Sequence, residues 1–65
     1  MEHTDAERLA FVQAALKAGQ DVVFQPLHLN GKRPISLSTT RGMCLGETVN
    51  EAIDAAIDGV WQDHL

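Results

Sequence analysis

The apolar positions near the start of the chain recur at the spacing of an amphipathic helix. The repeat consists of Leu9, Val12 and Leu16, widened by Phe11 and Ala15. The segment from Thr4 to Glu7 has the pattern of a capping box, in which a threonine hydroxyl and a glutamate three residues later satisfy free backbone N–H groups. Gly19 is suited to end the helix in a left-handed conformation. These signals predict a helix from about residue 5 to residue 18.

The same signals predict a second helix near the other end of the chain. Its apolar face is expected to contain Val49, Ile53, Ala56, Ile57 and Val60, with Ala52 and Trp61 beside them. Thr48 and Glu51 form a second capping-box pattern. Gly59 inside this helix costs about 1 kcal/mol relative to alanine, so it marks either a close approach to the first helix or early fraying. The helix is predicted from about residue 49 to residue 63.

Between the two helices, the segment from residue 21 to residue 40 is predicted to form a β-hairpin. Asn30-Gly31 is a strong hairpin signal because both residues tolerate the positive φ of a type I′ turn. A two-residue turn fixes the register, and every second pair then lies on the same face. The pairs on one face are Val22 with Thr39, Phe24 with Leu37, and Pro26 with Ile35. This face is the better candidate for the core, and the two helices are expected to cover it.

The two outer edges of the hairpin differ in their ability to accept another strand. Pro26 lacks an N–H group, and in this register the missing group points away from the second strand, so the outer edge of the first strand is blunted. The second strand has no proline from Ile35 to Thr40, so its outer edge is free to pair. The segment Met43-Cys44-Leu45 can fold back onto this edge, or a strand of a second chain can occupy it.

The whole chain, residues 1–65, is therefore expected to be a single domain of the α+β class. The predicted architecture is helix–β-hairpin–helix, with two helices packed on one face of a small antiparallel sheet. A short third strand or dimerisation extends that sheet. The competing fold is a mainly helical module with a mobile hairpin arm.

The second face of the hairpin carries more apolar residues than a water-facing sheet requires. Val23, Leu27 and Leu29 alternate along the first strand, and serines lie on the second strand. A small exposed apolar patch with a polar rim is typical of a contact surface. The alternative is that these are the scattered apolar side chains found on any protein surface. The three residues are the first candidates for binding a partner.

Carboxylates follow one side of the second predicted helix. They are Glu47, Glu51, Asp54 and Asp58, spaced four, three and four residues apart. Such an acidic ridge is either a solvated face or a docking surface for a basic partner. Glu51, Asp54 and Asp58 complete the candidate partner-binding residues. No histidine or serine nucleophile is placed beside them, so the carboxylates do not indicate a hydrolase.

Size and charge narrow the function further. A domain of 65 residues buries only about 60% of the surface of its unfolded chain, and the single cysteine cannot form an internal disulfide. A second subunit would supply the stability that so small a core lacks, so a homodimer is expected. The net charge is −4, whereas nucleic-acid-binding proteins usually have a positively charged surface, so direct binding to nucleic acid is not expected. No apolar run approaches the 18 residues of a membrane span, and a lone free cysteine suits the cytoplasm, or the host cytoplasm if a phage encodes the protein.

Cys44 is the one residue whose chemistry needs separate consideration. It lies shortly before a predicted helix start and close to Arg41, two features that lower a thiol pKa. It also lies between Met43 and Leu45, where a small apolar residue would serve the core equally well. The chain has no second cysteine, and His3, His28 and His64 are far apart in sequence. A thiol-dependent or metal-dependent activity at Cys44 is therefore an alternative, with no cofactor expected.

Two segments resemble different families. The segment TDAERLAFVQAAL before NGKR is similar to small phage head–tail joining proteins of the lambda W type. The segment GMCLGETVNEAIDAAI resembles the strand-to-helix corner of HicB-type antitoxins. The first resemblance implies a structural component of a larger assembly, and the second implies a regulator. Neither resemblance assigns a role to an individual residue.

The sequence thus predicts a small, non-catalytic protein-binding module rather than an enzyme. Regulators or inhibitors of phages, mobile elements and toxin–antitoxin loci are of this kind. The expected partner is a protein, with a basic surface if the acidic ridge makes the contact. The alternative function is that of a structural component, such as a phage head–tail connector.

Overall fold

The computed structural model describes residues 2–28 and 30–62, and contains two helices and three strands. In chain order these are α1 (Asp5–Lys17), β1 (Val23–Pro26), β2 (Ile35–Thr39), β3 (Gly42–Gly46) and α2 (Val49–Ile57). The order helix, three strands, helix confirms the predicted α+β class. Leu29, one of the candidate partner-binding residues, lies outside the described residues.

The three strands form one antiparallel sheet in the order β1-β2-β3. Phe24 lies opposite Leu37, as the hairpin register predicted, and Leu37 lies opposite Cys44 on β3. Asn30 and Gly31 have φ values of 50° and 79°, as a type I′ turn requires. The outer edge of β2 is therefore taken by the chain's own third strand.

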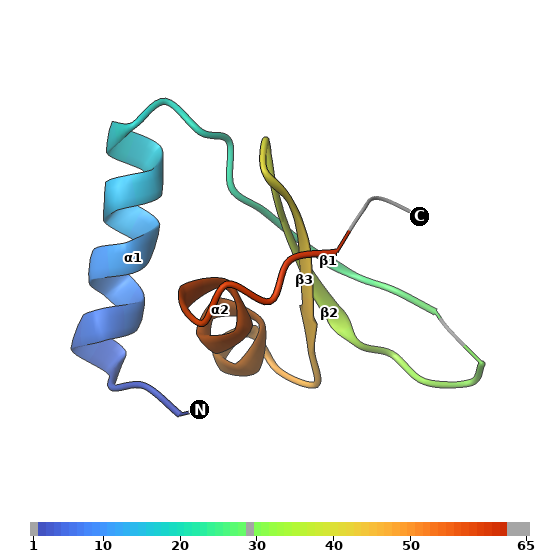
Figure 1. Cartoon of the computed structure of the whole chain (residues 1–65). Coiled ribbons are helices and arrows are strands. Elements are labelled where there is room, and N and C mark those ends of the chain that lie inside the picture. Colours follow the sequence, from blue (N-terminus) through green and yellow to red (C-terminus); the bar gives the residue numbers. More distant parts are fainter. Residues whose placement is uncertain (1, 29, 63–65) are drawn as a thin grey trace.

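The molecule has three layers when viewed along the sheet (Figure 1). The sheet forms one side, α2 lies on β2 and β3, and α1 packs against the far side of α2. Both helices are thus on the same side of the sheet, as predicted, but only α2 packs closely on it, and α1 packs chiefly on α2. This arrangement leaves β1 beyond the reach of α2.

The core is small and centres on the contact between α2 and the middle of the sheet. Its buried residues are Leu37, Cys44, Ala52, Ile53 and Ala56, with Phe11, Val12, Val22, Ala55, Ile57 and Trp61 packed around them. Gly46 permits the close approach of α2 to the end of β3. A Cβ atom on Gly46 would lie 2.5 Å from the backbone nitrogen of Ala52, which is too close for two nonbonded atoms. Because the clash is with the backbone, it cannot be removed by rotating a side chain.

Both helices begin at their predicted caps. The Thr4 hydroxyl accepts the Glu7 N–H at 3.2 Å, and the Glu7 carboxylate accepts the Thr4 N–H at 3.1 Å. At the start of α2 the Thr48 hydroxyl accepts the Glu51 N–H at 3.1 Å. The Glu51 carboxylate, however, accepts the N–H of Glu47, so the second capping box is only half formed.

The predicted end of the second helix was wrong. The helix ends at Ile57 instead of residue 63, because Gly59 takes a φ of +78° and turns the chain out of the helical path. The chain then returns to the sheet, where the Gln62 N–H donates to the Met43 carbonyl at 2.7 Å. Val49 and Val60, expected on the buried face, are exposed.

The predicted apolar stripe of the first helix was also partly wrong. Leu9 and Leu16 are exposed. The flank of α1 that meets the rest of the molecule contains Phe11, Val12 and the buried Ala15 instead. Helical periodicity located the helix but could not decide which of its apolar flanks would face α2.

No helix in residues 2–28 and 30–62 combines the length and the apolar character needed to cross a lipid bilayer.

Candidate protein-contact surface

The most accessible strand of the protein is β1. All four of its residues are exposed, and its outer edge pairs with no strand in the described part of the chain. Val23 and Phe24 leave 43% and 38% of their surface accessible. An unpaired strand edge with exposed apolar side chains can accept a strand of another chain, which makes β1 a candidate contact surface.

The backbone of β1 offers hydrogen-bonding groups at this edge. The Leu27 N–H donates to the carbonyl of Pro34, the residue before β2, at 2.8 Å, so the hydrogen-bonded pairing continues one residue beyond β1. Alternation along an antiparallel strand then turns the N–H and C=O groups of Phe24 outward. Pro26 also faces outward but has no N–H to donate. The edge is therefore only partly blunted, and no charged residue interrupts it from Val22 to Leu27.

The candidate residues on the second face of the sheet differ in accessibility. Val23 is exposed and Leu27 is half-buried. Their neighbours across the sheet are more enclosed, because Ser36 and Met43 are buried. The Ser36 hydroxyl donates to the Gln25 carbonyl at 3.2 Å. On this face of the sheet, the accessible apolar surface is therefore limited to β1 and does not extend over β2 and β3.

The acidic ridge predicted along the second helix is interrupted by an ion pair within the chain. Asp54 was expected on the surface, but its side chain is only 11% exposed and lies against α1. Arg8 Nε and Nη2 donate to its two carboxylate oxygens at 2.8 and 2.9 Å. The pairing lowers the pKa of Asp54, chiefly through the hydrogen bonds from Arg8. The Asp54 carboxylate therefore fastens α2 to α1.

Asp58 takes part in a second link between the ends of the two helices. His3 Nε2 lies 2.8 Å from Asp58 Oδ1, and His3 Nδ1 lies 3.4 Å from Glu7 Oε2. The hydrogen bond to Asp58 is the main reason why the pKa of His3 is raised. The same contact lowers the pKa of Asp58. His3 therefore bridges the first turn of α1 and the C-terminal cap of α2.

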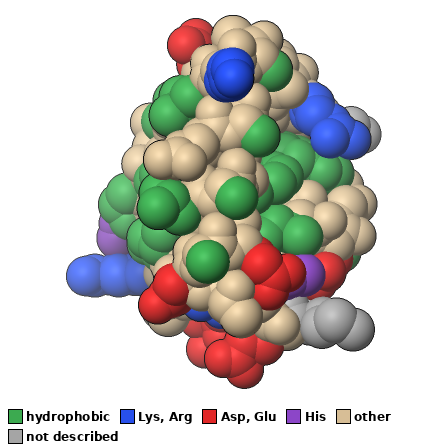
Figure 2. Space-filling model, turned by 90° about the vertical axis from the view of Figure 1, so that its left-hand side faces the viewer, with side chains coloured by type: hydrophobic (Ala, Val, Ile, Leu, Met, Phe, Trp, Pro, Cys, Tyr) green, Lys and Arg blue, Asp and Glu red, His purple; other side chains and the backbone are tan. Residues whose placement is uncertain are grey.

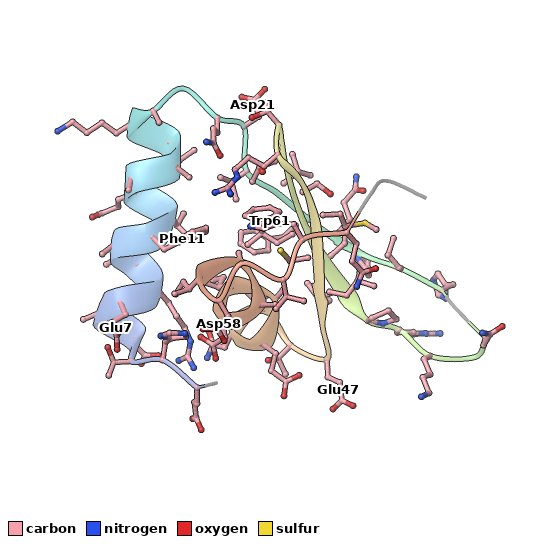
Figure 3. The ribbon with its side chains drawn as sticks, viewed as in Figure 1. Glu7, Phe11, Asp21, Glu47, Asp58 and Trp61 are labelled. Atoms are coloured by element: carbon pink, nitrogen blue, oxygen red, sulfur yellow. The ribbon has the colours of Figure 1, made fainter. Side chains whose placement is uncertain are left out.

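The tertiary structure nevertheless brings three of the four ridge carboxylates to one place. Glu51, Asp54 and Asp58 border an open depression of about 600 Å³, together with Glu2 and Arg8. Glu47 lies elsewhere, in a second open depression of about 560 Å³ beside the hairpin tip. Figure 3 shows Glu47 pointing away from Asp58 at the foot of the sheet. Because Arg8 pairs with Asp54 and His3 pairs with Asp58, the exposed carboxylates of Glu51 and Glu2 carry most of the accessible negative charge of this depression.

Cys44 lies in the core, as its apolar neighbours in the sequence suggested. Its side chain is completely buried beneath α2. Burial raises the pKa of the thiol, and the opposing effect of Arg41 is the smaller one. Arg41 instead places its guanidinium 5.1 Å from the centre of the Trp61 ring. Within residues 2–28 and 30–62, no three histidine, cysteine or carboxylate side chains are grouped so that they could hold a metal ion.

Sequence reasoning missed Arg8 and His3, the two residues that connect α1 with α2. A signal was present for Arg8, because it lies three, four and seven residues before Phe11, Val12 and Ala15, on the flank that is buried. A charged residue on an apolar flank calls for a partner of opposite charge. No comparable signal identifies His3, which is 55 residues from Asp58 in sequence.

Comparisons of the chain with profiles of protein families, with curated proteins and with solved structures found no match.

Proposed function

We propose that the protein is a non-catalytic protein-binding module, a small regulator or inhibitor of the kind that phages, mobile elements or toxin–antitoxin loci encode. The observation that carries this proposal is β1, an uncharged edge strand that is exposed along its whole length. An extended segment of the partner would pair with the outward N–H and C=O groups of Phe24 and cover Val23. Leu27 lies at the end of the same surface.

Exposed charge supports a second contact. Glu51 and Asp58 border the open depression beside α2. Asp58 is paired with His3, so the exposed carboxylate of Glu51 supplies most of the negative potential that favours a basic partner. Asp54 contributes by holding α1 in place, since its carboxylate is occupied by Arg8. The depression lies beside α2, and β1 lies beyond the reach of α2, so each contact can be tested separately.

The same structure gives little support to a function at the cysteine. The thiol of Cys44 is enclosed and has a raised pKa, which opposes formation of the reactive thiolate. A buried free thiol is compatible with a reducing compartment, and we place the regulator in the cytoplasm, or in the host cytoplasm if a phage encodes it.

Quantitative pull-down from a lysate of the encoding organism tests the site on β1. Val23→Asp introduces a charge into the proposed contact and is expected to lower recovery of a specific partner at least tenfold. Val49→Asp is the matched control, because Val49 has the same exposed fraction of 43% but lies at the start of α2. Equal recovery by wild type and Val23→Asp would exclude β1 as the binding site.

The acidic contact has its own test in the same assay. Charge reversal of Glu51 and Asp58 to lysine is expected to weaken binding of a basic partner and to reduce its dependence on salt. The control is Glu47→Lys, which makes the same change outside the depression. If the two charge reversals leave affinity unchanged, the acidic residues are a solvated surface only.

A homodimer belongs to this proposal, because a chain of 65 residues with a small core gains stability from a second subunit.

A further inference from the structure

The outward flank of α1, the one that faces away from α2, carries exposed leucines. Leu9 and Leu16 are 59% and 55% exposed. From Leu9 to Leu16 the helix contains no charged residue, and Gln13 is its one polar residue. A helix that is apolar on all sides is normally buried on all sides. Here α2 covers one flank, through Phe11, Val12 and Ala15, and leaves the other to solvent.

The exposed charges on α1 differ in sign between its two ends, because the one other charged side chain, Arg8, is only 11% exposed and pairs with Asp54. Asp5 and Glu7 lie in the first turn, and Lys17 lies in the last. Figure 2, which looks onto this side of the molecule, shows hydrophobic side chains over the face and most of the acidic side chains at its lower end, with a lysine or arginine and another acidic side chain at the upper end. The helix dipole adds positive charge at the N-terminus and negative charge at the C-terminus. If a second α1 packed against the first in the opposite direction, the acidic end of each helix would lie beside Lys17 of the other. The two helix dipoles would also be antiparallel, which is favourable.

We infer that the outward flank of α1 binds a second copy of this chain, with the two α1 helices antiparallel about a two-fold axis. This inference assigns a surface to the homodimer proposed above and does not depend on the partner site on β1. Leu9 of one copy faces Leu16 of the other, and symmetry repeats the contact at the opposite end. The axis then passes between Val12 and Gln13, midway between the two leucines in sequence.

The size of the surface sets the strength of this dimer. A helix of 13 residues is about 20 Å long and about 10 Å wide with its side chains. Its outward flank is therefore smaller than the roughly 800 Å² that each partner contributes to a standard protein–protein interface. We therefore expect a weak dimer whose population depends on protein concentration.

Sedimentation equilibrium between about 1 and 500 μM tests this inference. The average mass of the wild type is expected to rise from 7.1 kDa toward twice that value. The double variant Leu9→Glu, Leu16→Glu is expected to stay monomeric at all these concentrations. Val60→Glu is the control, because Val60 is 56% exposed but lies outside α1, and it is expected to dimerise like the wild type. Circular dichroism establishes that all variants are folded.

Disulfide cross-linking tests the antiparallel orientation. Two copies of Gln13→Cys meet at the axis and are expected to cross-link under mild oxidation. Two copies of Ala6→Cys lie about 20 Å apart along the helix pair, beyond the reach of a disulfide, and are expected to remain unlinked. In a parallel pair both variants would cross-link equally. The buried Cys44 of the wild type provides the unreactive background.

Several outcomes would overturn the inference. A wild type that remains monomeric at 500 μM has no such interface. A dimer that survives the double leucine substitution but is lost in Val23→Asp uses β1 instead. Assembly beyond the dimer excludes a closed two-fold pair and favours the structural-component alternative. The double leucine variant is expected to retain partner binding, so loss of the dimer and loss of the partner site are measured separately.

Discussion

Arg8 and Asp54 form a two-pronged ion pair between the helices, 46 residues apart in sequence, with Nε–Oδ1 and Nη2–Oδ2 distances of 2.8 and 2.9 Å. Both side chains are only 11% exposed. Parallel hydrogen bonds from a guanidinium to both oxygens of a carboxylate fix the relative orientation as well as the distance of the two groups. The pair therefore fixes the orientation of α1 on α2. This contribution matters because the apolar core is small.

Removing the Asp54 charge is expected to destabilise the protein. Asp54→Asn leaves the partly buried guanidinium of Arg8 without its main partner, so the melting temperature falls. Asp5→Asn is the control, because Asp5 also accepts a hydrogen bond from Arg8, at 2.9 Å, but its side chain is 93% exposed. Thermal denaturation followed by circular dichroism should show a much larger decrease for Asp54→Asn. Equal decreases would mean that burial of the pair is unimportant.

The contact between His3 and Asp58 makes stability depend on pH. The pKa of His3 is raised above 6.5, so its contribution is fully present below about pH 6.5 and is lost as the pH rises through the folded-state pKa. The pKa values of Asp54 and Asp58 are lowered from 3.8, so their contributions are present above about pH 3.8 and are lost on further acidification. The melting temperature is therefore expected to be highest between about pH 4 and 6.5.

A substitution of the histidine separates the two limbs of this profile. His3→Gln cannot take up a proton, so the decrease of the melting temperature on the alkaline side should disappear while the acidic decrease remains. The measurement is a series of melting curves from pH 3 to pH 9 for both proteins. An unchanged alkaline limb in His3→Gln would assign it to a different group.

A methyl group at Gly46 is expected to force α2 away from the sheet. The added Cβ would lie 2.5 Å from the Ala52 nitrogen and 2.7 Å from the Glu51 carbonyl carbon. Overpacking of this kind usually costs about 1–3 kcal/mol, and backbone atoms cannot move aside as a side chain would. Urea denaturation of Gly46→Ala measures the loss, and the exposed neighbour Glu47→Ala is the control. A variant as stable as the wild type would show that α2 can shift freely on β3.

The thiol of Cys44 is expected to react slowly in the native state. Burial raises its pKa and also blocks access of a reagent. Labelling with a thiol reagent at pH 8 should be at least a hundredfold slower without denaturant than with it, since reaction requires unfolding of the core. Gln13→Cys supplies an exposed thiol in the same chain as the reference for fast labelling. Comparable native rates at the two positions would restore the reactive interpretation of Cys44.

The local elements were predictable because their signals are local. Thr4 and Glu7 predicted the start of α1, and Asn30-Gly31 predicted both the turn and the pairing of Phe24 with Leu37. The third strand was one of two open alternatives, because a free strand edge can be filled by the same chain or by another. The end of α2 was misplaced because Gly59 permits a helix at moderate cost but also permits the positive φ that terminates one.

The candidate surface was only partly predictable. The sequence singled out Val23 as a possible contact, and its exposure is compatible with that role, which stays a prediction. Asp54 was assigned to an acidic surface because helical spacing alone places it in line with Glu51 and Asp58. Its burial depends on Arg8, a residue of another helix, and spacing within one helix carries no information about such a partner.

The sequence by itself determined where both helices begin, where the hairpin turns and which residues of β1 and β2 lie opposite each other, because caps, turn residues and alternation act within a few residues. The tertiary structure alone decided which flank of α1 meets α2, which carboxylates are neutralised, and that β1 and the outward side of α1 stay uncovered. These outcomes depend on how elements distant in sequence approach one another. That approach is set by the close fit at Gly46 and by the ion pair between Arg8 and Asp54.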